Sequence, residues 1–139
     1  MADCCSGGTS LIYSCSGQSN VGEIADKVVR KLRDEGFAKM ACLAGVGAEL
    51  AGYVQSAKGA DIVYAIDGCS TACAKRVLER VGATPQSVIL TELGIEKGTT
   101  PASDAVVEKM YVAIRDGSWS PQKERVDKQA GSCSCGGNC

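Results

Sequence analysis

The chain has 139 residues, a common size for a single domain that forms one hydrophobic core. Hydrophobic residues make up 45% of the sequence but aromatic residues only 4%, so Val, Ile, Leu and Ala must fill that core. Fifteen basic and sixteen acidic residues give a formal net charge of −1, and this lack of a basic excess argues against a nucleic-acid partner.

The N-terminal residues MADCCSGGTS contain neither the basic nor the apolar segment of an export signal, and no later apolar run approaches the length of a membrane span. We expect a flexible segment at 1–9 and a cytoplasmic protein without a membrane partner. A first strand is expected at 11–15. A helix follows from Val21, where apolar residues recur at helical spacing, with Asn20 as its cap and Gly36 in the left-handed position after its end.

The chain then repeats this alternation of a short apolar run and an amphipathic helix. The remaining strands are expected at 40–44, 62–66 and 88–93, and the remaining helices at about 50–57, 71–81 and 101–116. This order predicts the α/β class: one Rossmann-like domain at 10–117 with three layers, a four-stranded parallel sheet in the order 2-1-3-4 and helices on both faces. Ligands of such sheets bind beyond the carboxyl ends of the strands where the order reverses, here between the first and third strands.

The nine cysteines are the unusual feature of the composition. Their number is odd and no export signal is found, so metal binding or thiol chemistry is favoured over disulfides. The sequence contains no histidine, so a zinc site built by this chain must depend on thiolates, helped at most by carboxylates. Four of the cysteines fall at predicted strand ends or in the first turns of a predicted helix: Cys15, Cys42, Cys69 and Cys73.

These four cysteines are expected to converge on one crevice. Adjacent strands lie about 4.8 Å apart and two zinc-bound thiolates about 3.8 Å apart, so neighbouring strand ends can supply ligands to one ion. The amino ends of the first and third helices point to the same crevice and stabilise thiolates. Zinc is the expected occupant, and an iron-sulfur cluster, which uses the same four-thiolate set, stays open as an alternative.

A free cysteine is also a common small core residue, which is the competing interpretation for each of the four. Cys42 is the most open to it because it falls inside an apolar predicted strand. Cys69 and Cys73 flank a turn beside Gly68, which we expect to adopt a backbone conformation closed to other residues. Asp67 is interpreted as a turn former rather than as a support for a metal ligand.

The segment Ile66 to Lys75, which reads IDGCSTACAK, resembles the DGC-domain family, named for its central tripeptide. The resemblance extends over about residues 10–115, through the turn after Cys15, the segment around Cys42 and the later segment Thr91 to Lys97. It implies a zinc-binding protein, and it carries the chelating set of the family onto Cys15, Cys42, Cys69 and Cys73.

Residues 118–139 are interpreted as a flexible tail, since the helical periodicity ends before them and they are polar and contain several glycines. Cys133, Cys135 and Cys139 make this tail a candidate second, exchange-prone soft-metal site. Cys4, Cys5 or a metal- or sulfur-handling partner protein would complete its ligands. Both ends of the chain lie outside the family pattern.

A thiol-dependent redox or oxyanion-handling enzyme is the alternative, with Cys15 or Cys69 as nucleophile. The turn after Cys15 is similar to the anion-binding loop of low-molecular-weight phosphatases and arsenate reductases, which place an arginine after five intervening residues. That position is Val21 here, and the same spacing from Cys69 leads to Lys75, so both turns lack the arginine. The chain also lacks the Cys-x-x-Cys motif of thioredoxin-type sites. Whether the chain is an enzyme stays open.

Overall fold

The computed structural model describes residues 8–119, so most of both predicted flexible ends lies outside the described residues. The elements in chain order are β1 (Ser10–Ser14), α1 (Asn20–Asp34), β2 (Lys39–Met40), α2 (Leu43–Gly47), α3 (Ala51–Gly59), β3 (Ile62–Asp67), α4 (Cys73–Arg80), β4 (Gln86–Ile89), η1 (Leu90–Leu93) and α5 (Asp104–Arg115). Among the described helices, none has the length and apolar character needed to cross a bilayer.

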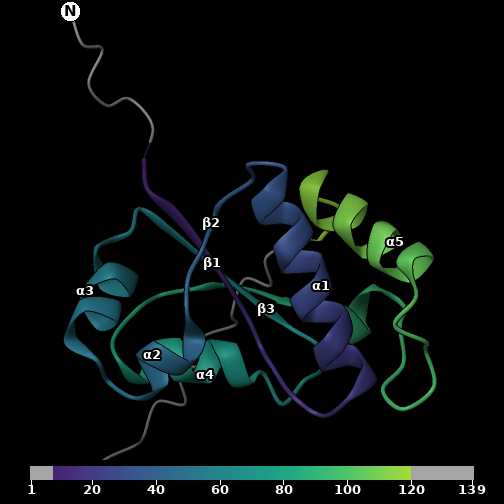
Figure 1. The fold of residues 1–139 in the computed structure, drawn as a ribbon, viewed down its shortest axis with the longest axis horizontal. Helices are drawn as coiled ribbons and strands as arrows, with labels where there is room; N and C mark the ends of the chain where they lie inside the picture. Colours follow the sequence, from purple (N-terminus) through teal and green to yellow (C-terminus); the bar gives the residue numbers. More distant parts are fainter. Residues whose placement is uncertain (1–7, 120–139) are drawn as a thin grey trace, which may run out of the picture.

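The four strands form one parallel sheet in the order β2-β1-β3-β4, which confirms the predicted fold class and strand order. β1 and β3 occupy the centre and pair along five residues, from Ser10 opposite Ile62 to Ser14 opposite Ile66. The sheet separates two helical layers: α1 and α5 pack together on one face, and α2, α3 and α4 lie on the other (Figure 1). All carboxyl strand ends therefore meet at one edge.

Each face of the sheet carries its own hydrophobic cluster. Along β1 the side chains alternate, so that Ile12 packs with α1 and α5, whereas Leu11 and Tyr13 pack with the opposite layer. Tyr13 and Ile12 are among the largest fully buried side chains. Most of the other buried residues are Val, Ile, Leu and Ala, as the composition requires.

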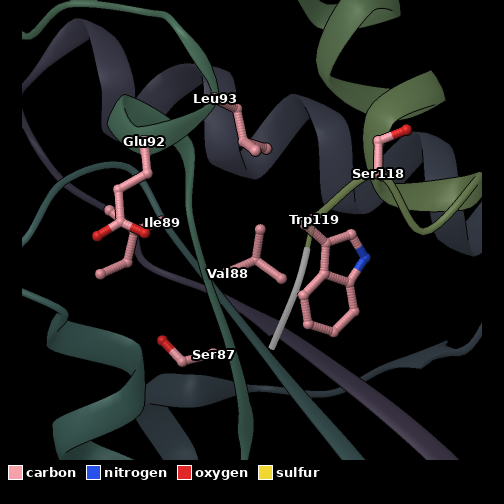
Figure 2. Close-up of a pocket in the computed structure, with 7 residues that line it drawn as sticks. All are labelled: Ser87, Val88, Ile89, Glu92, Leu93, Ser118 and Trp119. Carbon is pink, nitrogen blue, oxygen red and sulfur yellow. The ribbon is translucent and has the colours of Figure 1, made fainter. Parts of the chain in front are cut away.

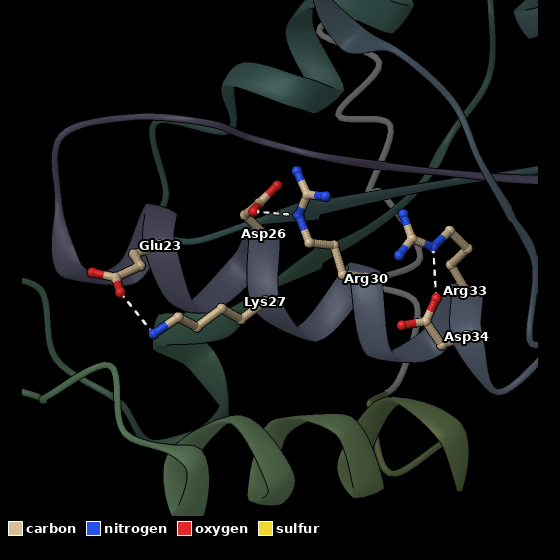
Figure 3. A network of polar contacts seen from close by, with 6 residues as sticks. All are labelled: Glu23, Asp26, Lys27, Arg30, Arg33 and Asp34. Carbon is tan, nitrogen blue, oxygen red and sulfur yellow. Dashed lines mark hydrogen bonds and ion pairs between the residues drawn. The ribbon is translucent and has the colours of Figure 1, made fainter.

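Helix α1 buries the predicted apolar stripe, with Val21, Ile24, Val28 and Leu32 inaccessible to solvent. Its outer face carries two ion pairs one turn apart, Glu23 with Lys27 and Asp26 with Arg30, each at 2.7 Å (Figure 3). Exposed pairs of this kind contribute about 0.3–0.5 kcal/mol each, so burial of the stripe holds the helix in place.

The cap of α1 differs from the prediction. Ser19 is the cap, and its Oγ accepts from the backbone N–H of Gly22 at 3.2 Å. Asn20 is instead the first helical residue, which frees its side chain for another contact described below. The helix ends as predicted, because Gly36 has a φ of +77° directly after it.

Two predicted strands are shorter than expected. The second stops at Met40, after which the backbone N–H of Ala41 donates to Ile12 O and the chain turns into α2. The fourth stops at Ile89, and the rest of its apolar run forms η1. A short apolar run does not distinguish a strand from a buried helical turn, which is why both boundaries were wrong.

The predicted starts of two later helices were also wrong. Helix α4 begins at Cys73 rather than Thr71, and α5 begins at Asp104 after the cap Ser103 rather than at Pro101. Thr100 precedes α5 and closes a turn in which its Oγ1 accepts from the backbone N–H of Glu96 at 2.8 Å.

Candidate thiolate site

Cys15 joins the ends of the two central strands. It directly follows β1, and its backbone N–H donates to Ile66 O at 3.0 Å, which extends the ladder with β3 by one residue. Its Sγ accepts from the backbone N–H of Gly68 at 3.2 Å. The sulfur therefore sits between β1 and β3, where the strand order reverses.

Gly68 is required at this position by a close approach between backbones. A Cβ on Gly68 would lie 2.5 Å from Val21 O and 2.6 Å from the carbonyl carbon of Val21, in the first turn of α1. Its φ is not in the left-handed region, so the predicted special backbone conformation was wrong. The glycine instead lets the end of β3 pack directly against the start of α1.

Asp67 caps helix α4 from a distance of seven residues. Its Oδ1 accepts from Ala74 N at 2.8 Å and its Oδ2 from Lys75 N at 3.1 Å. Ala72, at the cap position, has a φ of +52° and no side-chain oxygen to offer. Burial raises the pKa of Asp67, while the two amides and the nearby Lys75 ammonium oppose that rise. The carboxylate thus orients the helix that carries Cys73.

Cys69 is the more exposed of the two sulfurs at the ends of the central strands and is surrounded by donors. Its thiol lies 3.5 Å from Thr71 Oγ1, and Lys97 Nζ donates to the sulfur at 3.6 Å. Contacts with the Thr71 hydroxyl and backbone lower the pKa of Cys69, and the Lys97 charge adds to this effect. A hydroxyl hydrogen can rotate toward a thiolate, so the contact with Thr71 supports either protonation state.

The pKa of Cys15 is shifted in the opposite direction from that of Cys69. Burial raises its pKa to about 11, and repulsion from Asp67, Cys73 and Cys69 adds to that rise. The amide of Gly68 opposes it but does not overcome the desolvation. These repulsions also indicate that Cys15, Cys69 and Cys73 lie close enough for their charges to interact.

Cys42 lies outside the strand that was predicted to contain it. It is the N-terminal cap of α2, with its Sγ accepting from Gly45 N at 3.4 Å, and it is exposed. The core-packing interpretation of Cys42 was therefore wrong. Cys42 also acts on Tyr13, whose pKa is raised first by burial and then by the charge of Cys42.

The structure thus brings the four cysteines to one edge without bringing their sulfurs into one cluster. Cys42 and Cys73 stand at the amino ends of α2 and α4, which pack against each other, and both are exposed. Within residues 8–119, no three side chains of the Cys, Asp or Glu type are close enough together to hold a metal ion.

Comparison with known proteins decides the family. A family model described as the DGC domain matches residues 11–114. The chain belongs to the DGC-domain family. It is also similar to the anaerobic and virulence modulator AnvM of Pseudomonas aeruginosa, with 36% identity over 108 residues that cover 75% of this chain and 81% of AnvM. No solved structure matches the chain.

Sequence reasoning missed two residues of this DGC domain, Asn20 and Lys97. Both fall in the segments that resemble the family, yet Asn20 was taken for a helix cap and Lys97 was given no role. Asn20 binds the turn that carries Lys97, and Lys97 reaches Cys69 from 28 residues away. No local pattern in the sequence signals such contacts.

The hollow beside β4 is separate from these cysteines. It has a volume of about 550 Å³ and opens between β4, η1 and the end of α5 (Figure 2). Its lining residues are Ser87, Val88, Ile89, Glu92, Leu93, Ser118 and Trp119. None of the four cysteines lines it, so the DGC tripeptide does not serve this hollow.

Proposed function

We propose that this DGC domain binds a soft metal ion, zinc, through Cys15, Cys42, Cys69 and Cys73. One observation carries the proposal: every cysteine within residues 8–119 lies just beyond the carboxyl end of β1, β2 or β3, or begins the helix that follows β3. Four sulfurs without histidine are the ligand set of a structural zinc site or of an iron-sulfur cluster. Reduced thiols of this kind suit a reducing compartment such as the cytoplasm.

The surroundings of the sulfurs support metal binding. Backbone amides donate to Cys15 and Cys42, and Lys97 donates to Cys69, so three of the four sulfurs have donors that stabilise a thiolate. Hydrogen bonds to ligand sulfurs orient them and tune the metal. The side chains do not form a coordination sphere as they stand, so binding requires rotation of the exposed Cys42 and Cys73.

Metal analysis of anaerobically purified protein tests the proposal. Replacing the five cysteines outside residues 8–119 by serine isolates the domain site, and we expect about one zinc per chain in that background. Each further Cys→Ser change at the four positions should lower the content well below one. An unchanged content in both Cys69→Ser and Cys73→Ser would contradict the proposal. Visible absorption, in place of a colourless protein, would identify an iron-sulfur cluster instead.

The tail supplies a second part of the proposal. Cys133, Cys135 and Cys139 lie outside the described residues, and three thiols within seven positions suit a soft metal that exchanges with a metal- or sulfur-handling partner protein. Serine at these three positions should lower the total metal content while leaving the domain-bound metal in place. An unchanged total would remove the tail site.

A thiol-dependent reaction at Cys69 is the second candidate, favoured by its lowered pKa and its contact with Lys97. The relative AnvM is named an anaerobic modulator. A thiol that changes state with oxygen would suit such a role. Reaction of all four thiols at similar rates in the metal-free protein would argue against a dedicated nucleophile.

A further inference from the structure

Lys97 is placed beside Cys69 by a turn that contributes nothing to the core. The residue is exposed, and its Nζ lies 3.6 Å from Cys69 Sγ. No ion pair of Lys97 is found within residues 8–119, so a sulfur rather than a carboxylate faces its ammonium group. An exposed lysine without a carboxylate partner normally remains in solvent, because ordering its long side chain has an entropic cost.

Asn20 fixes the turn that carries Lys97. Its Nδ2 donates to Glu96 O at 3.0 Å and to Thr100 O at 2.6 Å, and its Oδ1 accepts from Gly98 N at 2.7 Å. Both amide hydrogens and the amide oxygen are therefore used on one turn. Asn20 also begins α1, five residues after Cys15, so one side chain connects the β1–α1 loop with the Lys97 turn.

We propose that Asn20 is a positioning residue that holds Lys97 over Cys69, and that Lys97 makes this sulfur selective for negatively charged ligands and reactants. This inference rests on the proposed role of Cys69 in the site. A thiolate alone repels an anion, whereas the ammonium group at 3.6 Å cancels that repulsion at the sulfur. The chemical class expected at Cys69 is thus a small anion, such as a carboxylate- or thiolate-bearing molecule.

Charge-matched alkylation of the metal-free full chain tests the inference. Iodoacetate is anionic and iodoacetamide is neutral, but the same thiolate attacks the methylene carbon of each and displaces iodide, so the ratio of their rate constants does not depend on the ionised fraction. Fragment-ion mass spectrometry separates Cys69 from Cys73. Removing one charge near the sulfur in Lys97→Gln should lower the iodoacetate-to-iodoacetamide ratio at Cys69 about fivefold, as expected for unit charges about 4 Å apart that are fully screened by water.

Three control variants make the result specific. Lys97→Arg keeps the charge and should keep most of the ratio, while Lys58→Gln removes an exposed charge from α3 and should leave it unchanged. Asn20→Ala keeps Lys97 but releases its turn, and should lower the ratio in the same direction. Equal ratios in Lys97→Gln and Lys58→Gln would overturn the inference, and so would an equal fall in Lys97→Arg.

The outcome is independent of metal content. A protein that binds no zinc, but whose alkylation ratio falls in Lys97→Gln, would refute the proposed metal function and retain the anion selectivity. A protein that binds zinc through Cys69, but whose alkylation ratio does not change in Lys97→Gln, would support the metal function and refute the anion selectivity.

Discussion

Cys15 and Cys69 follow the two central strands of the same sheet, yet the pKa values of their thiols are shifted in opposite directions. Cys15 is enclosed between β1 and β3 and has a pKa of about 11, whereas the pKa of Cys69 is lowered by Thr71 and Lys97. The position at a strand end therefore does not determine the state of a thiol. Desolvation controls the first cysteine, and hydrogen-bond donors control the second.

The difference assigns separate tasks to the β1–α1 loop, which carries Cys15, and to the β3–α4 loop, which carries Cys69. At neutral pH Cys15 holds its proton, so it needs a metal ion to displace that proton before it can act as a ligand. Cys69 ionises more readily, so of these two sulfurs it is the first to react with an incoming ion or electrophile.

The largest effect is expected from Gly68→Ala, which forces the end of β3 away from the first turn of α1. Its Cβ would lie 2.5 Å from Val21 O, and because both partners are backbone, neither can rotate away. We expect a loss of about 3 kcal/mol in the free energy of unfolding, measured by urea denaturation.

Gly17→Ala is the matched control, since nothing lies within 4 Å of the added carbon. It should change the stability by less than about 0.5 kcal/mol. Equal stabilities of the two variants would show that the contact between Gly68 and α1 is not maintained in solution.

The next effect concerns the rates at which the two thiols react with iodoacetamide. At about pH 8 a thiol with the ordinary pKa of 9.0 is ionised to about 10%, and one with a pKa of about 11 to about 0.1%. The more basic thiolate is the better nucleophile, which recovers about tenfold. We therefore expect Cys69 to react at least tenfold faster than Cys15.

The pH profile of the same reaction sharpens this comparison. Only the thiolate reacts, so each rate rises with pH until the pKa of its thiol is passed. The midpoint of the rise at Cys69 should lie below pH 9, whereas the midpoint at Cys15 should lie at about pH 11. Parallel profiles would refute the assigned acidities.

The fold was predictable because its signals are local. The run 62–66 is apolar and bounded by aspartates, and it is β3 in the structure with one residue added. The run 40–44 has the same appearance, but only Met40 belongs to β2 and the rest of the run leads into α2, because this edge strand has β1 as its neighbour on one side only. Hydrophobicity marks burial, and the pairing partner decides the length of the strand.

The site was predictable in position but not in contacts. Parallel strands with this order must bring Cys15 and Cys69 to one edge, and the sequence contains enough information to place them there. Ser19 and Asn20 are both good caps, so the sequence alone does not say which of them is free to bind the Lys97 turn. Contacts across many residues depend on loop conformation, which no short pattern encodes.

A moderate effect is expected from Asp67→Ala, which removes the cap of the helix that carries Cys73. The change removes the acceptor of two backbone amides at the start of α4 and leaves the buried N–H of Ala74 without its partner. We expect a loss of about 1.5 kcal/mol in urea denaturation. Asp61→Ala is the control, because this aspartate before β3 is exposed and its Oδ2 accepts from Thr9 N at 2.6 Å, so it also loses a bond to a backbone amide but at the surface. A similar loss in both variants would show that the cap on α4 has no special weight.

The smallest effect is expected from Cys42→Ser. This variant separates the contribution of Cys42 to stability from its proposed role in zinc binding. The Cys42 sulfur caps α2 through a long bond of 3.4 Å to Gly45 N, and serine is a better cap than a thiol. Serine should therefore stabilise α2, and we expect a gain of about 0.5 kcal/mol in the free energy of unfolding. The zinc content of the same variant should fall, because its oxygen does not replace a thiolate. A loss of stability greater than about 1 kcal/mol would instead show that the sulfur packs as an apolar group, and Cys42 would then leave the ligand set.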